Sequence, residues 1–378
     1  MKILHLADSH LGFSNFSRVD RVGRNLMEEK IYQGFERVVD RILEIRPDAV
    51  VHAGDVFHHV RPRIRPLYVF KKGLERLQEA GIPVVVISGN HDAPKSYAAV
   101  SPFLLFEGMR DVHIAHRYSY QSFEVGDHTF HCIPFCLSPE DYLPEFHKIA
   151  MTGDDVLVMH GLVEALGNHR MMTVGEHQIK DSLLKSDFHY IALGHYHNQA
   201  RISENAWYSG SVEYFNFGEA RDCKGMLLVD LESGRATPVP VHAPYMVDHS
   251  PVDCLGLSPG QILEEIQSRS CQAEDRIVRI NLFNVDRSSY RRINPAQIGQ
   301  LGSKALYLKV RVQYVDEPSP GPSGAVDALR LPDEFRKFMD VVRGELPRAI
   351  QEEVMSYGSQ LIRGAVESRN TEALDAPQ

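Results

Sequence analysis

Cysteine is scarce in this chain and follows no regular spacing. The five cysteines among 378 residues, Cys132, Cys136, Cys223, Cys254 and Cys271, form an odd and scattered set, which argues against a disulfide framework. Cys132 and Cys136 have a spacing that a metal pair could use, but no second pair accompanies them. We therefore expect reduced thiols, with these two buried as small apolar side chains.

Long apolar runs are also lacking. The longest have the length of a β-strand and are interrupted by His, Gly or Pro, whereas a membrane-spanning helix needs about 20 apolar residues. The N-terminus enters a strand-like segment at once, without the basic region and apolar core of a signal peptide. These absences predict a cytoplasmic protein with no membrane partner.

The chain has no overall excess of basic charge. Its formal net charge of −9 would count against a nucleic-acid partner, but phosphate contacts depend on local charge. The stretch from residue 61 to residue 76 contains one acid, Glu75, and the basic residues Arg61, Arg63, Arg65, Lys71, Lys72 and Arg76. A solvated helix face and a phosphate-binding surface explain this cluster equally well.

Five short polar motifs each follow an apolar, strand-like run. The runs are residues 3–7, 49–53, 83–87, 156–159 and 190–193, and the motifs are Asp8-Ser9-His10, Gly54-Asp55, Gly89-Asn90-His91-Asp92, His160-Gly161 and Gly194-His195-Tyr196-His197. Buried strands that repeatedly hand a carboxylate, an amide or an imidazole to a Gly-containing turn gather these groups at one edge of a sheet. The pattern predicts a single site.

The side chains of these motifs suit a pair of divalent metal ions. Carboxylate, amide and imidazole groups bind manganese, iron or zinc, and one carboxylate can bridge two ions without any cysteine. One such motif arises often by chance, but five in this order are specific. His113, His116, His128 and His131 lie in an alternating region without acidic companions, so surface or cross-strand positions are expected for them.

Helical and strand-like patterns alternate through the first part of the chain. Apolar residues recur at helical spacing between residues 31 and 43, before Arg46-Pro47, and a second helix is predicted over residues 67–80. Short alternating runs at 122–125, 129–133 and 225–231 predict a second sheet packed on the first, with helices outside both. The expected fold is a layered α/β/β/α sandwich.

The rest of the chain divides by composition. Residues 1–244 are predicted to form the domain with the metal motifs, and residues 245–315 a small α+β unit with a helix after Ser258-Pro259-Gly260 and strands at 276–283 and 304–314. Residues 316–326 are rich in Pro, Gly and Ser and predict a linker. Residues 327–368 have helical apolar spacing, which fits docking on this chain or on a partner, and residues 369–378 predict a flexible tail.

The order of the five motifs resembles that of the calcineurin-like metallophosphoesterase superfamily. Residues 2–12, 54–58, 208–211 and 217–219 further resemble the SbcD-type nucleases of DNA double-strand-break repair, a resemblance that covers about residues 1–230. It implies two Mn²⁺ ions, one held by Asp8, His10, Asp55 and His197, the other by Asp55, Asn90, His160 and His195. It also implies that His91 faces the scissile phosphate, that His58 reaches the substrate, and that the small unit caps the DNA.

The implied activity is metal-dependent cleavage of DNA ends, as a 3′ to 5′ exonuclease on duplexes and an endonuclease on single strands. The implied partners are DNA, with Arg61, Arg63 and Arg65 as candidate contacts, an SbcC-type SMC-like coiled-coil ATPase bound by the C-terminal helices, and a second copy in a homodimer. The alternative is a two-metal phosphodiesterase or phosphatase acting on a small molecule or a phosphoprotein. The complete ligand set disfavours a noncatalytic scaffold.

Overall fold

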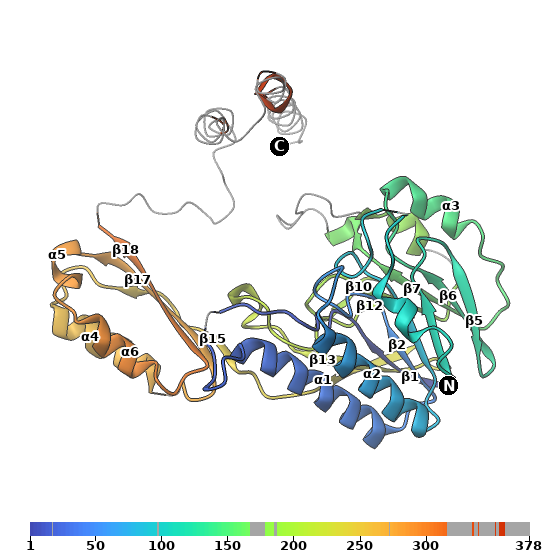
Figure 1. The fold of residues 1–378 in the computed structure, drawn as a ribbon, viewed down its shortest axis with the longest axis horizontal. Helices are drawn as coiled ribbons and strands as arrows, with labels where there is room; N and C mark the ends of the chain where they lie inside the picture. The colour runs from blue at the N-terminus through green and yellow to red at the C-terminus, as the bar shows by residue number, and fades with distance from the viewer. Residues whose placement is uncertain are drawn as a thin grey trace. The chain divides into compact units, whose positions relative to one another are not determined.

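Two six-stranded sheets carry most of the chain in the computed structural model (Figure 1). The first contains β1 (Lys2–Leu6), β2 (Ala49–His52), β3 (Val84–Ile87), β4 (Val112–Ala115), β13 (Gly225–Asp230) and β14 (Arg235–Pro240), in the order β14-β13-β1-β2-β3-β4. The second contains β5 (Gln121–Val125), β6 (His128–Ile133), β7 (Asp155–His160), β10 (Tyr190–Gly194), β11 (Ala200–Arg201) and β12 (Ala206–Tyr208), in the order β11-β12-β10-β7-β6-β5. Both sheets mix parallel and antiparallel pairs.

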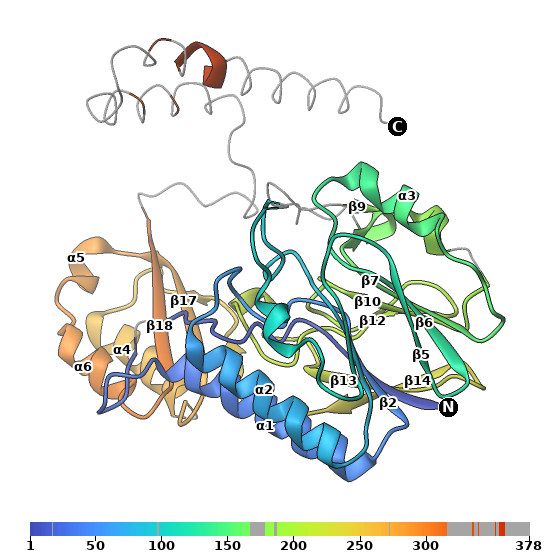
Figure 2. The same cartoon turned by 45° about the vertical axis from the view of Figure 1, so that its right-hand side comes forward.

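The two sheets pack face to face, as predicted. Buried side chains such as Val51 and Val85 from the first sheet meet Phe130 and Val158 from the second. Helices α1 (Leu26–Ile45) and α2 (Ile64–Glu79) cover the outer face of the first sheet and lie side by side in both views (Figures 1 and 2). The outer face of the second sheet packs against α3 (Tyr142–Phe146) and the 3₁₀ helix η4 (Asp181–Leu184).

Several shorter elements complete this part of the chain. They are the 3₁₀ helices η1 (Pro102–Phe106), η2 (Pro139–Asp141), η3 (Glu164–Leu166) and η5 (Phe217–Glu219), and the strand pair β8 (Leu162–Val163) and β9 (Gln178–Ile179). Cys132 and Cys136 are buried among the strands, which confirms their expected packing role.

Local sequence signals explain where the long helices begin and end. The Asn25 side chain caps α1 by accepting hydrogen bonds from the amides of Met27 and Glu28. Arg46 ends the helix with a left-handed conformation (φ 51°), and a proline follows it. The predicted helix over 67–80 is confirmed as α2, which begins three residues earlier than predicted.

One strand assignment from the sequence is wrong. The alternating run at 225–231 was expected in the second sheet, but β13 pairs antiparallel with β1 in the first. Alternation reports that one face of a strand is more buried than the other and does not say which sheet the strand joins. In the opposite sense, β7 and β10 carry two of the five motifs and belong to the second sheet. The motifs therefore meet between two sheets and not along one edge.

A third, smaller sheet follows in sequence. It contains β15 (Met246–Asp248), β16 (Val252–Asp253), β17 (Ile277–Val285) and β18 (Tyr307–Tyr314). With α4 (Pro259–Ser270), α5 (Arg287–Tyr290) and α6 (Pro295–Leu301) it encloses a core that includes Ile262, Ile266 and Ile280. A capping box between Ser258 and Gln261 begins α4, as the Ser-Pro-Gly start predicted.

The structure describes residues 1–16, 18–96, 98–166, 178–184, 187–271 and 273–315, together with 335, 339, 352 and 355–359. The chain divides into the units Met1–Val315 and Asp316–Gln378. The predicted linker and tail lie outside the described residues, as does most of the predicted helical segment, of which 355–359 are helical. Among the described residues, no helix has the length and apolar character needed to cross a membrane.

A buried carboxylate ties α1 to the chain that leads into the third sheet. Glu213 is fully buried and accepts hydrogen bonds from the Arg37 guanidinium (3.0 Å) and the Tyr245 hydroxyl (2.6 Å). His242 Nε2 lies 3.0 Å from the same carboxylate. A buried charge is tolerated only with such partners.

We expect Glu213→Ala to lower the free energy of unfolding by about 3 kcal/mol, because it leaves Arg37 and His242 beside an uncompensated cavity. Urea denaturation of the metal-free protein measures this. The matched control is Glu232→Ala, whose side chain is 86% exposed and which should change stability by less than about 0.5 kcal/mol. Equal effects from the two substitutions would contradict the role given to Glu213.

Candidate metal centre

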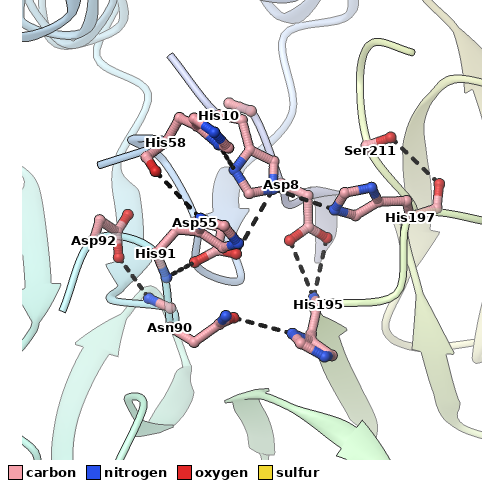
Figure 3. Close-up of polar contacts among 12 residues, drawn as sticks. Asp8, His10, Asp55, His58, Asn90, His91, Asp92, His195, His197 and Ser211 are labelled. Carbon is pink, nitrogen blue, oxygen red and sulfur yellow. Dashed lines mark hydrogen bonds and ion pairs between the residues drawn. The ribbon is translucent and has the colours of Figure 1, made fainter. Parts of the chain in front are cut away.

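The carboxyl ends of five strands, β1, β2, β3, β7 and β10, bring the five motifs together (Figure 3). Four of the seven predicted ligands have positive φ, namely Asp8 (53°), His10 (43°), Asp55 (55°) and His195 (103°). Side chains other than glycine rarely adopt this conformation, and it concentrates at functional sites. Hydrogen bonds from the amides of Asp8 to Gly54 O and of His10 to Asp55 O, both 3.0 Å, hold the first two loops together.

A first group of possible ligands comprises Asp8, His10 and His197. The Nε2 atoms of the two imidazoles lie only 3.2 Å apart, and one donor atom from each of the three residues falls within 4.8 Å of the others. The backbone amide of His195 donates to both Asp8 oxygens, at 3.2 and 3.0 Å. This contact orients the carboxylate toward the two imidazoles.

A second group comprises Asp55, His160 and His195, and Asn90 joins it. The Asn90 side-chain oxygen lies 2.9 Å from His160 Nε2 and 3.0 Å from His195 Nδ1. One carboxylate, one amide oxygen and two imidazoles thus point at the same space. This donor set matches the one predicted for the second ion.

Asp55 lies between the two groups. Its Oδ2 atom is 3.7 Å from His10 Nε2 in the first group and 3.5 Å from His160 Nε2 in the second. Its Oδ1 atom accepts a hydrogen bond of 2.8 Å from the backbone amide of His91. The position is the one that a bridging carboxylate requires.

Hydrogen bonds at the far side of two rings fix the atoms that face the site. His160 Nδ1 donates to the carbonyl of Ala53 at 2.8 Å, and His197 Nδ1 donates to Glu219 Oε1 at 3.0 Å. Each bond leaves a lone pair on Nε2 directed at the donor groups above, which is how protein imidazoles are prepared for metal binding. The residues present therefore fit two divalent ions.

His58 and His91 stand next to this centre. Their rings stack with centroids 5.0 Å apart and an interplanar angle of 19°, and His91 Nδ1 donates to the carbonyl of His58 at 3.2 Å. His58 Nδ1 lies 3.3 Å from His10 Nδ1. Its neighbour His59 is exposed and touches only the edge of the His58 ring, so of the two it is His58 that faces the site.

Burial and charge divide the protonation states of the centre. Burial would raise the pKa of Asp55, but the neighbouring His160 and His10 hold it well below its usual value. Burial would lower the pKa of His160, but the Asp55 carboxylate raises it to about 9. Burial lowers the pKa of His195 to about 3 and of His58 to about 4. Without a cation at neutral pH, Asp55 is ionised, His160 carries a proton, and His195 and His58 are neutral.

Two carboxylates support the site without belonging to either donor group. Asp92 is buried and accepts hydrogen bonds from the amides of Gly89 (2.7 Å) and Phe57 (3.2 Å), which joins the loops after β2 and β3. Glu219 holds His197, as described above. Sequence reasoning included both residues in its motifs but gave neither a role, because their partners are distant in sequence.

Two glycines in the motifs are required by close packing. A Cβ atom on Gly54 would collide with the His160 ring, and one on Gly89 would collide with Asp55. Gly54 also has φ +97°, which side-chain-bearing residues adopt only with strain. The glycines of these motifs thus allow the loops to approach each other closely enough to share Asp55.

The other predicted residues are placed unevenly. Arg61 and Arg63 are exposed, whereas the Arg65 guanidinium pairs with Glu29 and lies 4.5 Å from the centroid of the Tyr32 ring. His116 and His131 were expected to lack acidic companions, and this is wrong. Both are buried, and they bond Glu107 and Asp155 at 2.9 and 2.7 Å. These partners come from other segments, so local sequence could not reveal them.

The centre opens into a cleft of about 310 Å³. Asp55, His91, His195 and His197 line its floor. Its remaining walls include Leu162, Tyr196, Asn198, Asn216 and Asp222. A phosphate ester can therefore approach both donor groups from one side.

Comparison with known proteins agrees with this geometry. The sequence model of the calcineurin-like phosphoesterase family matches residues 1–222, and the chain belongs to this family. It is 30% identical over 254 residues to the DNA double-strand break repair protein Mre11 of Methanococcus maripaludis, covering 61% of this chain and 63% of the relative. It is 26% identical over 271 residues to the SbcD component of the nuclease SbcCD of Staphylococcus saprophyticus, covering 63% and 67%.

These comparisons have a limited span. The chain covers less than two thirds of the length of several archaeal relatives, such as 62% of the Mre11 protein of Methanocaldococcus jannaschii, to which it is 28% identical. Among solved structures, TT1561 of Thermus thermophilus aligns with a TM-score of 0.40 and 12% identity, over 64% of this chain and 99% of that one.

The protonation of His160 predicts how metal binding depends on pH. Its pKa of about 9 means that a cation must displace a proton at neutral pH, so affinity for Mn²⁺ should rise by up to about tenfold per pH unit and level off above pH 9. Calorimetric titration at pH 6.5, 7.5 and 8.5, in two buffers of different ionisation enthalpy, measures both affinity and proton release. An affinity that does not change with pH would contradict this assignment.

Proposed function

We propose that this chain is a metal-dependent nuclease that processes DNA ends in double-strand-break repair. The observation that carries the proposal is the pair of donor groups that share Asp55 beside His91. Relatives named as Mre11 and as the SbcD component of the nuclease SbcCD support DNA as the substrate. Cleavage from 3′ to 5′ on duplexes and internal cleavage of single strands are proposed from the SbcD resemblance.

The donor groups would hold two Mn²⁺ ions with the assignment predicted from the sequence. When bound, such ions supply Lewis-acid stabilisation of the charge on the phosphate. Asp55 would be shared between the two positions. Asn90 contributes a neutral oxygen, which limits the negative charge that would otherwise oppose the approach of a phosphodiester.

His91 and His58 are proposed to act on the substrate. The bond from His91 Nδ1 to the His58 carbonyl orients the ring, so that Nε2 is the atom left to carry and transfer a proton. In this proposal His91 Nε2 donates that proton to the leaving 3′ oxygen. His58 stacks against the ring and contacts the phosphate as a neutral imidazole.

Two exposed basic surfaces are proposed to contact the DNA backbone. Arg61 and Arg63 follow the His58 loop directly. Lys309 and Arg311 are exposed and share one face of β18, because alternate residues of a strand point to the same side. The second surface belongs to residues 245–315, which we propose to be the capping domain next to a nuclease domain of residues 1–244. Arg65 is a weaker candidate, since it is paired with Glu29.

A coiled-coil ATPase of the SbcC type is proposed as the partner, bound by residues 327–368. The support is the SbcD resemblance and a relative that is named as part of the nuclease SbcCD. Most of that segment lies outside the described residues.

A homodimer is proposed through an exposed apolar surface on α2 and η1. Ile64 and Tyr68, one helical turn apart, are 85% and 58% exposed. Phe103 of η1 packs against Phe70 of α2, while Leu105 of η1 is 65% exposed. Large apolar side chains gathered on two packed elements are typical of an interface.

Light scattering after size exclusion tests the dimer. The wild type should have twice the chain mass, and Tyr68→Glu should shift the protein to monomer, because it places a charge in an apolar contact. Leu255→Glu is the control, since Leu255 is 68% exposed on the third sheet and should leave the dimer intact. A monomeric wild type, or a dimeric Tyr68→Glu variant, would contradict the proposed surface.

The nuclease assignment predicts a separation of metal binding from catalysis. With Mn²⁺ and end-labelled duplex DNA, Asp55→Ala should lose both metal and cleavage. His91→Ala should keep both ions yet cleave more slowly by about 10³-fold, the range expected for loss of a proton-transfer group. The control His147→Ala alters an exposed histidine at the end of α3 and should behave as wild type.

Two outcomes would count against this assignment. Loss of metal from His91→Ala would place that residue among the ligands. Wild-type protein that leaves duplex and single-stranded DNA intact but hydrolyses bis(p-nitrophenyl) phosphate would favour the alternative, a phosphodiesterase acting on small molecules.

A further inference from the structure

One buried ammonium group lies behind the metal centre. Lys224 is 3% exposed and stands immediately before β13, the strand that pairs with β1. Its Nζ donates to Ser211 Oγ at 2.8 Å, to Glu219 Oε2 at 2.9 Å and to the carbonyl of His197 at 3.0 Å. Asp222 Oδ2 is farther away, at 3.4 Å. The three hydrogens of the ammonium are therefore matched by three close acceptors.

Glu219 links this ammonium to the imidazole of His197. One carboxylate oxygen, Oε2, accepts from Lys224, and the other, Oε1, accepts from His197 Nδ1 at 3.0 Å. Asn216 and the amide of Phe215 donate to the same carboxylate at 2.6 and 3.0 Å. The carboxylate is thus held in one orientation by four donors.

Lys224 consequently contacts His197 from two directions. It bonds the main-chain carbonyl directly, and it holds the ring through Glu219. Ser211 adds a bond of 3.4 Å to the same carbonyl (Figure 3). A ring fixed at its backbone and at Nδ1 keeps Nε2 directed toward His10 and Asp8.

We propose that Lys224 is a positioning residue that sets the affinity of the ion site formed by Asp8, His10 and His197. The inference rests on the metal centre of the proposed function, and it concerns binding and not cleavage. A simpler role would be to neutralise the buried Glu219 charge. The two roles differ because neutralisation can be restored by removing both charges, whereas positioning cannot.

Full-length Lys224→Met protein tests the inference by titration with Mn²⁺. Calorimetry should show one of two ions bound about 10- to 100-fold more weakly, the usual cost of losing a group that orients a metal-binding histidine. The other ion should bind as in the wild type. Electron paramagnetic resonance should show uncoupled Mn²⁺ at a concentration that gives a coupled pair in the wild type. The control Lys304→Met removes an exposed lysine (75%) and should retain the coupled pair.

The double variant Glu219→Gln/Lys224→Met separates positioning from neutralisation. Its melting temperature should recover toward the wild-type value, because no unpaired buried charge remains, while the weak ion stays weak. Recovery of both would overturn the proposal. If Lys224→Met alone fails to fold, this neutral pair supplies the measurement.

The inference and the proposed function fail separately. A wild type that binds two coupled Mn²⁺ ions without cleaving DNA would reject the nuclease and leave the role of Lys224 to the binding data. A folded Lys224→Met variant that binds both ions with wild-type affinity would overturn the inference even if the wild type cleaves DNA. A wild type that binds no coupled pair would overturn both.

Discussion

The close convergence of buried imidazoles and carboxylates around Asp55 is the constraint on which the rest of the structure depends. His10 and His197 direct nitrogen atoms at each other, and Asn90, His160 and His195 do the same with their donor atoms. Such groups stay together without penalty only when protons or cations lie between them. Strained loops, paired glycines and the packing of two sheets all serve to bring these side chains within reach of one another.

The segment between β12 and β13 contains no strand, yet it connects the centre to the rest of the chain. Ser211, Glu219 and Lys224 hold His197 from behind, while Glu213 in the same segment ties α1 to the start of the third sheet. This gives a physical reason for the residues at 208–211 and 217–219 that resembled SbcD-type nucleases. They support a metal ligand and do not form the substrate site themselves.

The sequence predicted the centre better than its surroundings. Asp8, His10, Asp55, Asn90, His160, His195 and His197 were found because each follows an apolar strand, and the structure brings all of them together. Asp92 and Glu219 received no role, since their partners lie across the fold. The sheet of β13 was wrong because alternation reports a buried face without its partner. The acidic partners of His116 and His131 were missed for the same reason of distance.

The most direct test of this account is the position of bound metal. Crystals of the full chain with Mn²⁺, measured for anomalous scattering, should show two peaks about 3.5–4 Å apart. Asp55 should contact both ions, His197 only the one shared with Asp8 and His10, and His195 only the other. A single peak, or two ions of which only one touches Asp55, would contradict the shared centre.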